Sequence, residues 1–155
     1  MISQLEVADT ELLFSSQCIS AKIDCYKQIA YHLCKAARYY LAHLNKMLGL
    51  GMSGTENLLT LLRAAAKKGF SFEESKILFM ATINSIANAD SEESYITYND
   101  VIQLRVNVTE LRELILQFLD KRYRQNMLTE LKIQENEPSE LQSVKQKLIS
   151  QLRGD

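Results

Sequence analysis

The side chains best suited to catalysis or metal binding gather in the first third of the chain. They are the two histidines and the three cysteines: His32, His43, Cys18, Cys25 and Cys34. A di-iron helical bundle uses Glu and His three residues apart, whereas Ile29 and Tyr40 precede the two histidines at that spacing. Cysteine and histidine positions on one helical face here lie two turns apart, too far for one zinc ion. The sequence therefore predicts no metal site.

Motifs for nucleophilic catalysis and nucleotide binding are also missing. No cysteine is placed beside a histidine in a loop, and no G-x-S-x-G sequence occurs. The glycine-rich segment 49–54 lacks the G-K-[ST] of a P-loop. We therefore expect no catalytic residues and no cofactor, and a protein that is not an enzyme. The odd number of cysteines argues against a closed disulfide framework, and Cys18 and Cys25, seven residues apart on one predicted helix, cannot bond within it. Free thiols are therefore expected, with a disulfide between two chains as the alternative.

His32 is the one histidine that suggests a specific chemistry. The predicted helix places it toward water, with Lys35 three residues later and the small Ala36 four residues later. This arrangement resembles histidine-phosphotransfer domains, in which an exposed histidine, a nearby lysine and a small residue serve phosphoryl transfer to a response regulator. The likeness spans only His32 to Ala36, and alanine stands where that family commonly has glycine. It implies an alternative function, a phosphorelay protein that uses His32 and Lys35.

The element that carries these residues is predicted to be one long helix. From Asp9 to Leu48 there is no Gly or Pro, and apolar or small side chains recur every seven residues. They form an a/d pattern of about five heptads. Its rows are Leu12, Ile19, Tyr26, Leu33, Tyr40 and Met47, and Ile23, Ala30, Ala37 and Leu44. A helix of roughly 60 Å exceeds the diameter of around 40 Å expected of a compact globule of this size, so it must kink, elongate the bundle or project toward another molecule.

This apolar seam requires a partner, and the sequence favours self-association through it and a second long helix. Leu33, Tyr40 and Leu44 are the expected contact residues within the seam. Tyr31 and Tyr39 lie on the side that a simple antiparallel pairing leaves open. There they can anchor a protein partner or, as the alternative, complete a wide core face of the bundle. Replacing Leu33 and Leu44 by polar residues is expected to dissociate a dimer or to unfold the chain.

Capping residues and glycines divide the rest of the chain into helices. Three pairs spaced three residues apart predict N-termini: Ser53 with Glu56, Ser71 with Glu74, and Thr97 with Asp100. For the last of these helices, Ser91 and Ser94 are alternative, earlier starts. The expected helices cover residues 54–68, 71–89 and 98–133, and residues 88–94 form a connection. Gly69 suits the left-handed position that ends the first of these helices. The helix 98–133 has an apolar seam of Val101, Leu104, Val108, Leu111, Ile115 and Phe118.

The C-terminal segment contains a narrow apolar stripe. It follows Pro138, which is tolerated as the first residue of a helix, and includes Leu141, Val144 and Leu148. Polar residues surround the stripe, so this helix can dock on the bundle, pair with its copy in another chain, or fray. We expect residues 1–136 to form a helical bundle domain and residues 137–155 a C-terminal amphipathic helix.

Composition limits the possible partners. The net charge is −1, which gives no general attraction to nucleic acid, and no apolar run approaches the length of a membrane span. The N-terminus lacks the features of a secretory signal, so a cytoplasmic location and no membrane insertion are expected. A helix-turn-helix around Gly69 is a second alternative, but its recognition helix would begin Phe72-Glu73-Glu74, which would repel phosphate.

These observations favour an all-α protein, an elongated bundle of about five helices of which two are long and amphipathic. The expected function is a non-enzymatic protein–protein interaction module, such as an adaptor, a regulator, a secretion-associated chaperone or an immunity-type protein. We expect it to bind a protein partner and to form a homo-oligomer, and not to bind nucleic acid.

Overall fold

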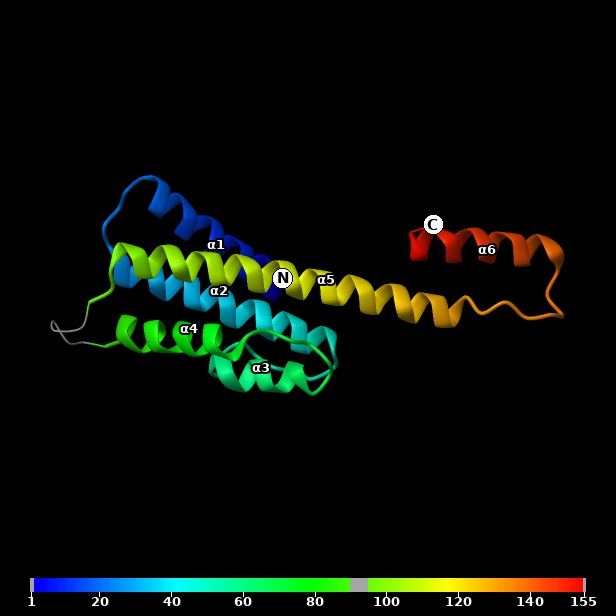
Figure 1. Cartoon of the computed structure of the whole chain (residues 1–155), viewed down its shortest axis with the longest axis horizontal. Helices are drawn as coiled ribbons and strands as arrows, with labels where there is room; N and C mark the ends of the chain where they lie inside the picture. Colours follow the sequence, from blue (N-terminus) through cyan, green and yellow to red (C-terminus); the bar gives the residue numbers. More distant parts are fainter. Residues whose placement is uncertain (1, 90–94, 155) are drawn as a thin grey trace. The chain divides into compact units, whose positions relative to one another are not determined.

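The computed structural model describes residues 2–89 and 95–154 of the chain (Figure 1). The described residues form helices without a strand, which confirms the all-α prediction, with six helices where about five were expected. The helices are α1 (Gln4–Ser20), α2 (Tyr26–Met47), α3 (Leu58–Ala66), α4 (Glu74–Ala87), α5 (Tyr98–Glu130) and α6 (Ser139–Arg153). The chain divides within α5 into two compact units. Residues 1–115 form the core unit, and residues 116–155 form the C-terminal hairpin.

The predicted single helix from Asp9 to Leu48 is wrong, because the segment is an antiparallel helical hairpin. α1 starts at Gln4, where Ser3 and Glu6 form a capping box, and ends at Ser20. Beyond it, Lys22 takes the left-handed conformation with φ 57°. The Lys22 N–H donates to the Ile19 carbonyl (3.0 Å) and the Ile23 N–H to the Cys18 carbonyl (3.1 Å). This is the Schellman arrangement that ends a helix, with lysine where glycine is usual.

This turn gives a stability prediction. An L-residue in the left-handed region costs roughly 1–2 kcal/mol, and glycine avoids that cost but loses about 0.5–1 kcal/mol through its freer unfolded chain. Lys22→Gly is therefore expected to raise the free energy of unfolding by about 0.5–1 kcal/mol in urea titrations. Lys22→Ala is the control, because it removes the charge and keeps the strained conformation. Equal stabilities for the two variants would contradict this explanation of the turn.

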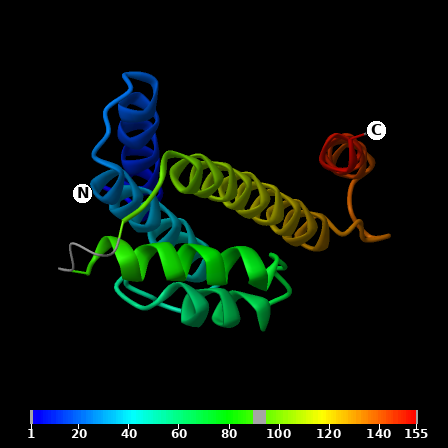
Figure 2. The same ribbon diagram turned by 60° about the vertical axis from the view of Figure 1, so that its left-hand side comes forward.

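α2 is the central helix of the core unit. It contacts α1 on one side and α3 and α4 on the other, and α3 and α4 also contact each other (Figures 1 and 2). Its side chains are accordingly buried around most of its circumference, including Ile29, Ala30, Leu33, Cys34, Ala36, Ala37, Tyr40, Leu41, Ala42, Leu44 and Asn45. The part of the predicted seam from Ala30 to Leu44 is thus covered by helices of the same chain, whereas Ile23 and Met47 at its edges are exposed.

The start of α5 matches the prediction closely. Thr97 and Asp100 cap it reciprocally: the Thr97 N–H donates to Asp100 Oδ2 (3.0 Å), and the Asp100 N–H to Thr97 Oγ1 (3.1 Å). The predicted seam is buried from Val101 to Ile115, while Phe118 is half-buried. Of the predicted connection 88–94, residues 90–94 lie outside the described part of the chain.

The other two predicted caps do not start helices. Glu56 does bond to the Ser53 backbone, but α3 begins at Leu58, four residues after the predicted start at residue 54. Its N-cap is Asn57, whose Oδ1 accepts from the Thr60 N–H (2.8 Å). α4 begins at Glu74, and no side chain caps it. Gly69 is left-handed (φ 98°), as predicted, and follows the end of α3.

The C-terminal hairpin consists of the end of α5 and α6. Arg124 donates to the Leu152 carbonyl (3.0 Å), and Lys145 donates to the Lys132 carbonyl (3.3 Å), so the two helices run antiparallel. Pro138 is the N-cap of α6 and not its first residue. The expected division after residue 136 differs from the division of the compact units, which falls between Ile115 and Leu116. No helix in the described ranges is long and apolar enough to cross a bilayer.

Candidate functional site

The predicted interaction residues lie partly in the core and partly at the surface. Leu33, Tyr40 and Leu44 have no exposed surface, because α2 is enclosed by its neighbours. A side chain buried in this way cannot contact a second molecule in the folded state, so these three residues belong to the core and not to an interaction surface. The predicted residues that do lie at the surface are Tyr31, Tyr39, Leu141, Val144 and Leu148.

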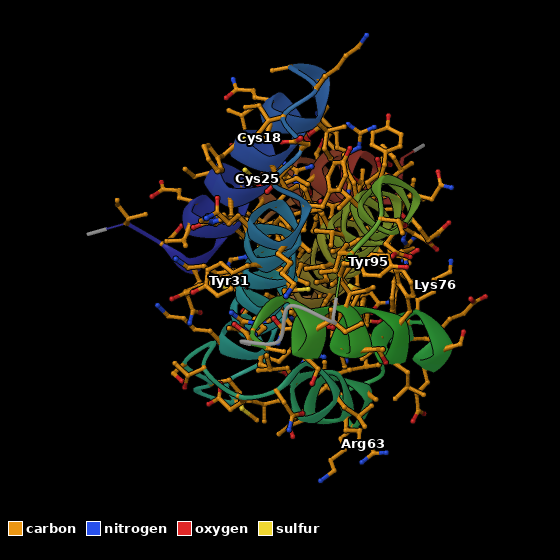
Figure 3. The ribbon with its side chains drawn as sticks, turned by 90° about the vertical axis from the view of Figure 1, so that its left-hand side faces the viewer. Cys18, Cys25, Tyr31, Arg63, Lys76 and Tyr95 are labelled. Carbon is orange, nitrogen blue, oxygen red and sulfur yellow. The ribbon has the colours of Figure 1, made fainter. Side chains whose placement is uncertain are left out.

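Tyr31 and Tyr39 help to line a groove on the core unit. They share one stripe of α2 with Lys35 and Arg38, because positions four, seven and eight residues apart lie on one helical face. The stripe faces the α2–α3 connection and the C-terminal part of α4, and the hollow between them has a volume of about 460 Å³. Tyr31 is 38% exposed and lies at the surface of the core unit (Figure 3).

Three asparagines form the opposite wall of this hollow: Asn57, Asn84 and Asn88. Asn84 Oδ1 accepts hydrogen bonds from Arg38 Nη1 and from Asn88 Nδ2, each at 3.2 Å. Asn88 Nδ2 also donates to the Asn84 carbonyl (2.8 Å). These bonds hold the Arg38 guanidinium against α4.

Gly54 allows the α2–α3 connection to approach α2 closely. It is left-handed (φ 93°), and a Cβ there would lie 3.4 Å from Ala42 Cβ and 3.5 Å from the Tyr39 ring. Glu56 closes the same connection by accepting from the N–H groups of Ser53 (3.2 Å) and Gly54 (2.9 Å). Hydrogen bonds from backbone N–H groups lower the pKa of Glu56, so its charge stabilises the loop. The loop in turn positions Tyr39.

A second hollow of about 370 Å³ continues the first between α3 and α4. Both hollows are lined by Arg38, Asn57 and Asn84, so they share an edge. The second one is more aliphatic, with Leu59 and the 48% exposed Leu78 in its lining. We call the two hollows together the α2–α4 groove. It combines an aromatic and cationic part with an aliphatic part.

The two cations of the groove are not equivalent. Lys35 Nζ pairs with Glu11 Oε1 of α1 (3.1 Å), and this hydrogen bond raises the pKa of Lys35. Among the described residues, Arg38 has the Asn84 amide as its partner and no carboxylate within ion-pair distance. An arginine has five N–H donors, so most of its donors remain for a ligand. Arg38 is therefore the positive charge that a partner could neutralise.

His32 does not line the groove but lies beside it, between α1 and α2. Its Nδ1 is 2.5 Å from Glu11 Oε2, and the rings of Phe14 and Tyr31 contact it edge-on, with centroids 5.2 and 5.3 Å away. Glu11 thus bridges His32 and Lys35, the two residues of the phosphotransfer alternative. A carboxylate between them neutralises the lysine and repels a phosphoryl group.

The cysteines are free thiols, as predicted, although one argument for this was wrong. Cys18 and Cys25 do not share a helix, because the α1–α2 turn separates them (Figure 3). Cys34 donates to the Met80 carbonyl (3.5 Å), and burial raises its pKa to about 12, so it is protonated and inert at neutral pH. No group of three potential metal ligands occurs within residues 2–89 and 95–154.

Part of the groove consists of residues that the sequence had singled out for other reasons. Tyr31 and Tyr39 were predicted as interaction residues and Lys35 as part of the phosphotransfer alternative, and Arg38 completes their stripe. Asn57, Asn84 and Asn88 come from segments that only the tertiary fold brings together. In comparisons by sequence and by structure, the chain matches no family model, no curated protein and no solved structure.

Proposed function

We propose that this protein is a non-enzymatic protein–protein interaction module, and that the α2–α4 groove binds an exposed segment of a partner protein. The observation that carries this proposal is the shared edge of the two hollows, where Arg38 lies between an aromatic and an aliphatic surface. Such a combination provides an anchor for one charged and one apolar side chain of the same segment. This mode of binding suits an adaptor or a regulator.

The groove defines the chemistry of its partner. Arg38 selects a carboxylate, because charge-assisted hydrogen bonds to a guanidinium are strong and directional. Leu59 and Leu78 select an aliphatic side chain on the other side of Arg38. The asparagine amides can bond to the peptide groups of an extended segment. We therefore expect a segment in which an acidic residue lies close to Leu, Ile or Val.

A display library of random peptides tests this proposal with the full-length protein as bait. Enriched peptides are expected to contain an acidic residue near an aliphatic one. Arg38→Glu should weaken their binding at least about tenfold, since losing a charge-assisted bond costs roughly 1.5–3 kcal/mol. Titration calorimetry with one enriched peptide gives the affinities.

Two variants outside the groove serve as matched controls. Arg63→Glu makes the same charge change on α3 at a side chain that is 66% exposed, and it should leave affinity unchanged. Leu78→Ser should weaken binding, whereas Met47→Ser, at a residue that is 60% exposed on α2, should not. Peptides that bind Arg38→Glu as well as they bind the unmodified protein would refute the groove as their site.

Neither of the other functions gains support from the geometry. Glu11 lies between His32 and Lys35, which disfavours a phosphoryl group at that position. In the helix-turn-helix alternative, Glu73 and Glu74 are exposed at the start of α4, where DNA phosphates would approach. We therefore propose neither phosphoryl transfer nor DNA binding.

A further inference from the structure

The apolar stripe of α6 is exposed on the C-terminal hairpin. Leu141, Val144 and Leu148 are 43%, 55% and 41% exposed, although they form a continuous row along the helix. α6 has no fully buried residue. A hairpin of this size buries too little apolar surface to be stable on that basis alone. The stripe is therefore a surface that a further contact would stabilise.

Other residues of α6 contact the segment that joins it to α5. Gln142 donates to the carbonyls of Gln134 (3.3 Å) and Glu137 (2.9 Å), and Lys145 forms an ion pair with Glu137. These contacts hold α6 against the chain that leads into it. Leu141, Val144 and Leu148 form the adjacent row, which stays exposed even though Leu148 also borders the hollow between α5 and α6.

Two charged residues border the stripe along one edge. Glu140 and Lys147 are seven residues apart, so they lie on the same side of α6, and each immediately precedes a leucine of the stripe. Both are exposed, and neither has an ion-pair partner among the described residues. Two other pairs of charges are satisfied within the hairpin, Lys145 with Glu137 and Arg124 with Asp120.

We propose that the stripe is the contact between two copies of this chain, with their α6 helices antiparallel about a two-fold axis at Val144. The pattern is self-complementary about that residue. Leu141 and Leu148 lie on either side of Val144 at nearly equal distances, so each Leu141 meets the partner's Leu148. Glu140 and Lys147 are placed in the same way, so each Glu140 meets the partner's Lys147. The same two-fold rotation therefore buries the apolar row and pairs the charges that are unpaired in one chain.

The groove between the two helices of the hairpin extends this contact. It has a volume of about 320 Å³. Its apolar lining includes Tyr123 and Met127 of α5, Leu131 just beyond the end of α5, and Leu148 and Leu152 of α6. Three stripe residues and part of this lining make a small interface, below the standard size. We expect a weak dimer with a dissociation constant on the order of 10–100 µM. This proposal does not depend on the α2–α4 groove of the core unit.

Sedimentation velocity of the full-length protein tests whether the dimer exists. The mass should rise with concentration from 17.7 kDa toward twice that value. Val144→Asp should abolish the rise while the helical circular dichroism signal is unchanged. A protein that stays monomeric at every concentration refutes the proposal. That result is expected if another part of the same chain covers the stripe. A dimer that Val144→Asp leaves intact also refutes the proposal.

Charge exchange tests the antiparallel arrangement. Glu140→Lys alone and Lys147→Glu alone should each weaken the dimer by about fivefold, because each places like charges together twice across the axis. The double variant should recover to within about twofold of the original dissociation constant. Failure of the double variant to recover would refute this geometry.

Disulfide trapping locates the axis. In a Cys18→Ser, Cys25→Ser background, Val144→Cys should form a covalent dimer with glutathione disulfide, because a two-fold axis brings the two positions together. Gln146→Cys, exposed on another side of α6, should remain monomeric under the same conditions. Equal trapping at both positions would contradict an axis at Val144. The native Cys34 is buried in every variant.

Discussion

Replacing Leu44 by alanine is expected to lower the free energy of unfolding by about 2–5 kcal/mol, the range for a leucine removed from a well-packed core. Leu44 has no exposed surface and lies in the central helix α2, which α1, α3 and α4 surround. Urea titrations followed by circular dichroism measure the loss. The effect should not depend on protein concentration, because the packing partners of Leu44 belong to the same chain.

Met47→Ala on the same helix is the matched control for this prediction. The heptad pattern treats Leu44 and Met47 alike, since both belong to the predicted seam, but Met47 is 60% exposed. Its replacement should change stability by no more than about 0.5 kcal/mol. A loss for Leu44→Ala that shrinks as protein concentration rises would instead indicate an intermolecular seam.

The fold class and the second long helix could be predicted because their signals are local. The Thr97–Asp100 cap and the apolar residues from Val101 to Ile115 specify the start and the buried face of α5 without reference to distant residues. The capping pair Ser3 and Glu6 is a local signal of the same kind. It marks the start of α1 at Gln4, whereas the heptad pattern alone predicts a start at Asp9.

The break between α1 and α2 could not be read from composition. Lys22 occupies a left-handed position that glycine usually fills, and the heptad spacing continues through the turn. What fixes the turn is tertiary: α1 folds back to cover α2, and the burial gained there outweighs the strain at one residue. A long heptad pattern therefore predicted an intermolecular seam where the chain forms a hairpin.

The α2 side of the candidate site has a signal in the sequence, whereas the side opposite α2 has none. Tyr31, Lys35 and Tyr39 recur at helical spacing, so one helix presents them together. The asparagines opposite them lie on the α2–α3 connection and on α4, and nothing in the sequence relates those segments to α2. Their convergence on Arg38 follows from the packing of α4 against α2.

The buried hydroxyl of Tyr40 depends on Asp9 for its hydrogen bond. Asp9 Oδ1 of α1 accepts from the Tyr40 hydroxyl of α2 (2.5 Å) and from Arg112 Nε of α5 (2.8 Å). Asp9→Ala leaves the Tyr40 hydroxyl, which has no exposed surface, without its acceptor. The expected loss of stability is about 1–3 kcal/mol, the cost of an unsatisfied buried polar group. In the Asp9→Ala background, Tyr40→Phe should recover part of the lost stability, because this second change removes the hydroxyl that has no acceptor.

The same network makes stability depend on pH in a defined direction. Burial tends to raise the pKa of Asp9, but the hydrogen bonds from Arg112 and Tyr40 outweigh it and lower this pKa below its usual value of 3.8. The unfolded chain therefore takes up the proton first as pH falls. The contribution of ionised Asp9 is complete above about pH 4 and is lost as pH falls toward its folded pKa. Asp9→Asn should show a shallower loss of stability than the unmodified protein between pH 4 and 2, measured by urea titration at each pH. Parallel curves would mean that other carboxylates govern the acid transition and that the Asp9 charge adds nothing to the contact between α1, α2 and α5.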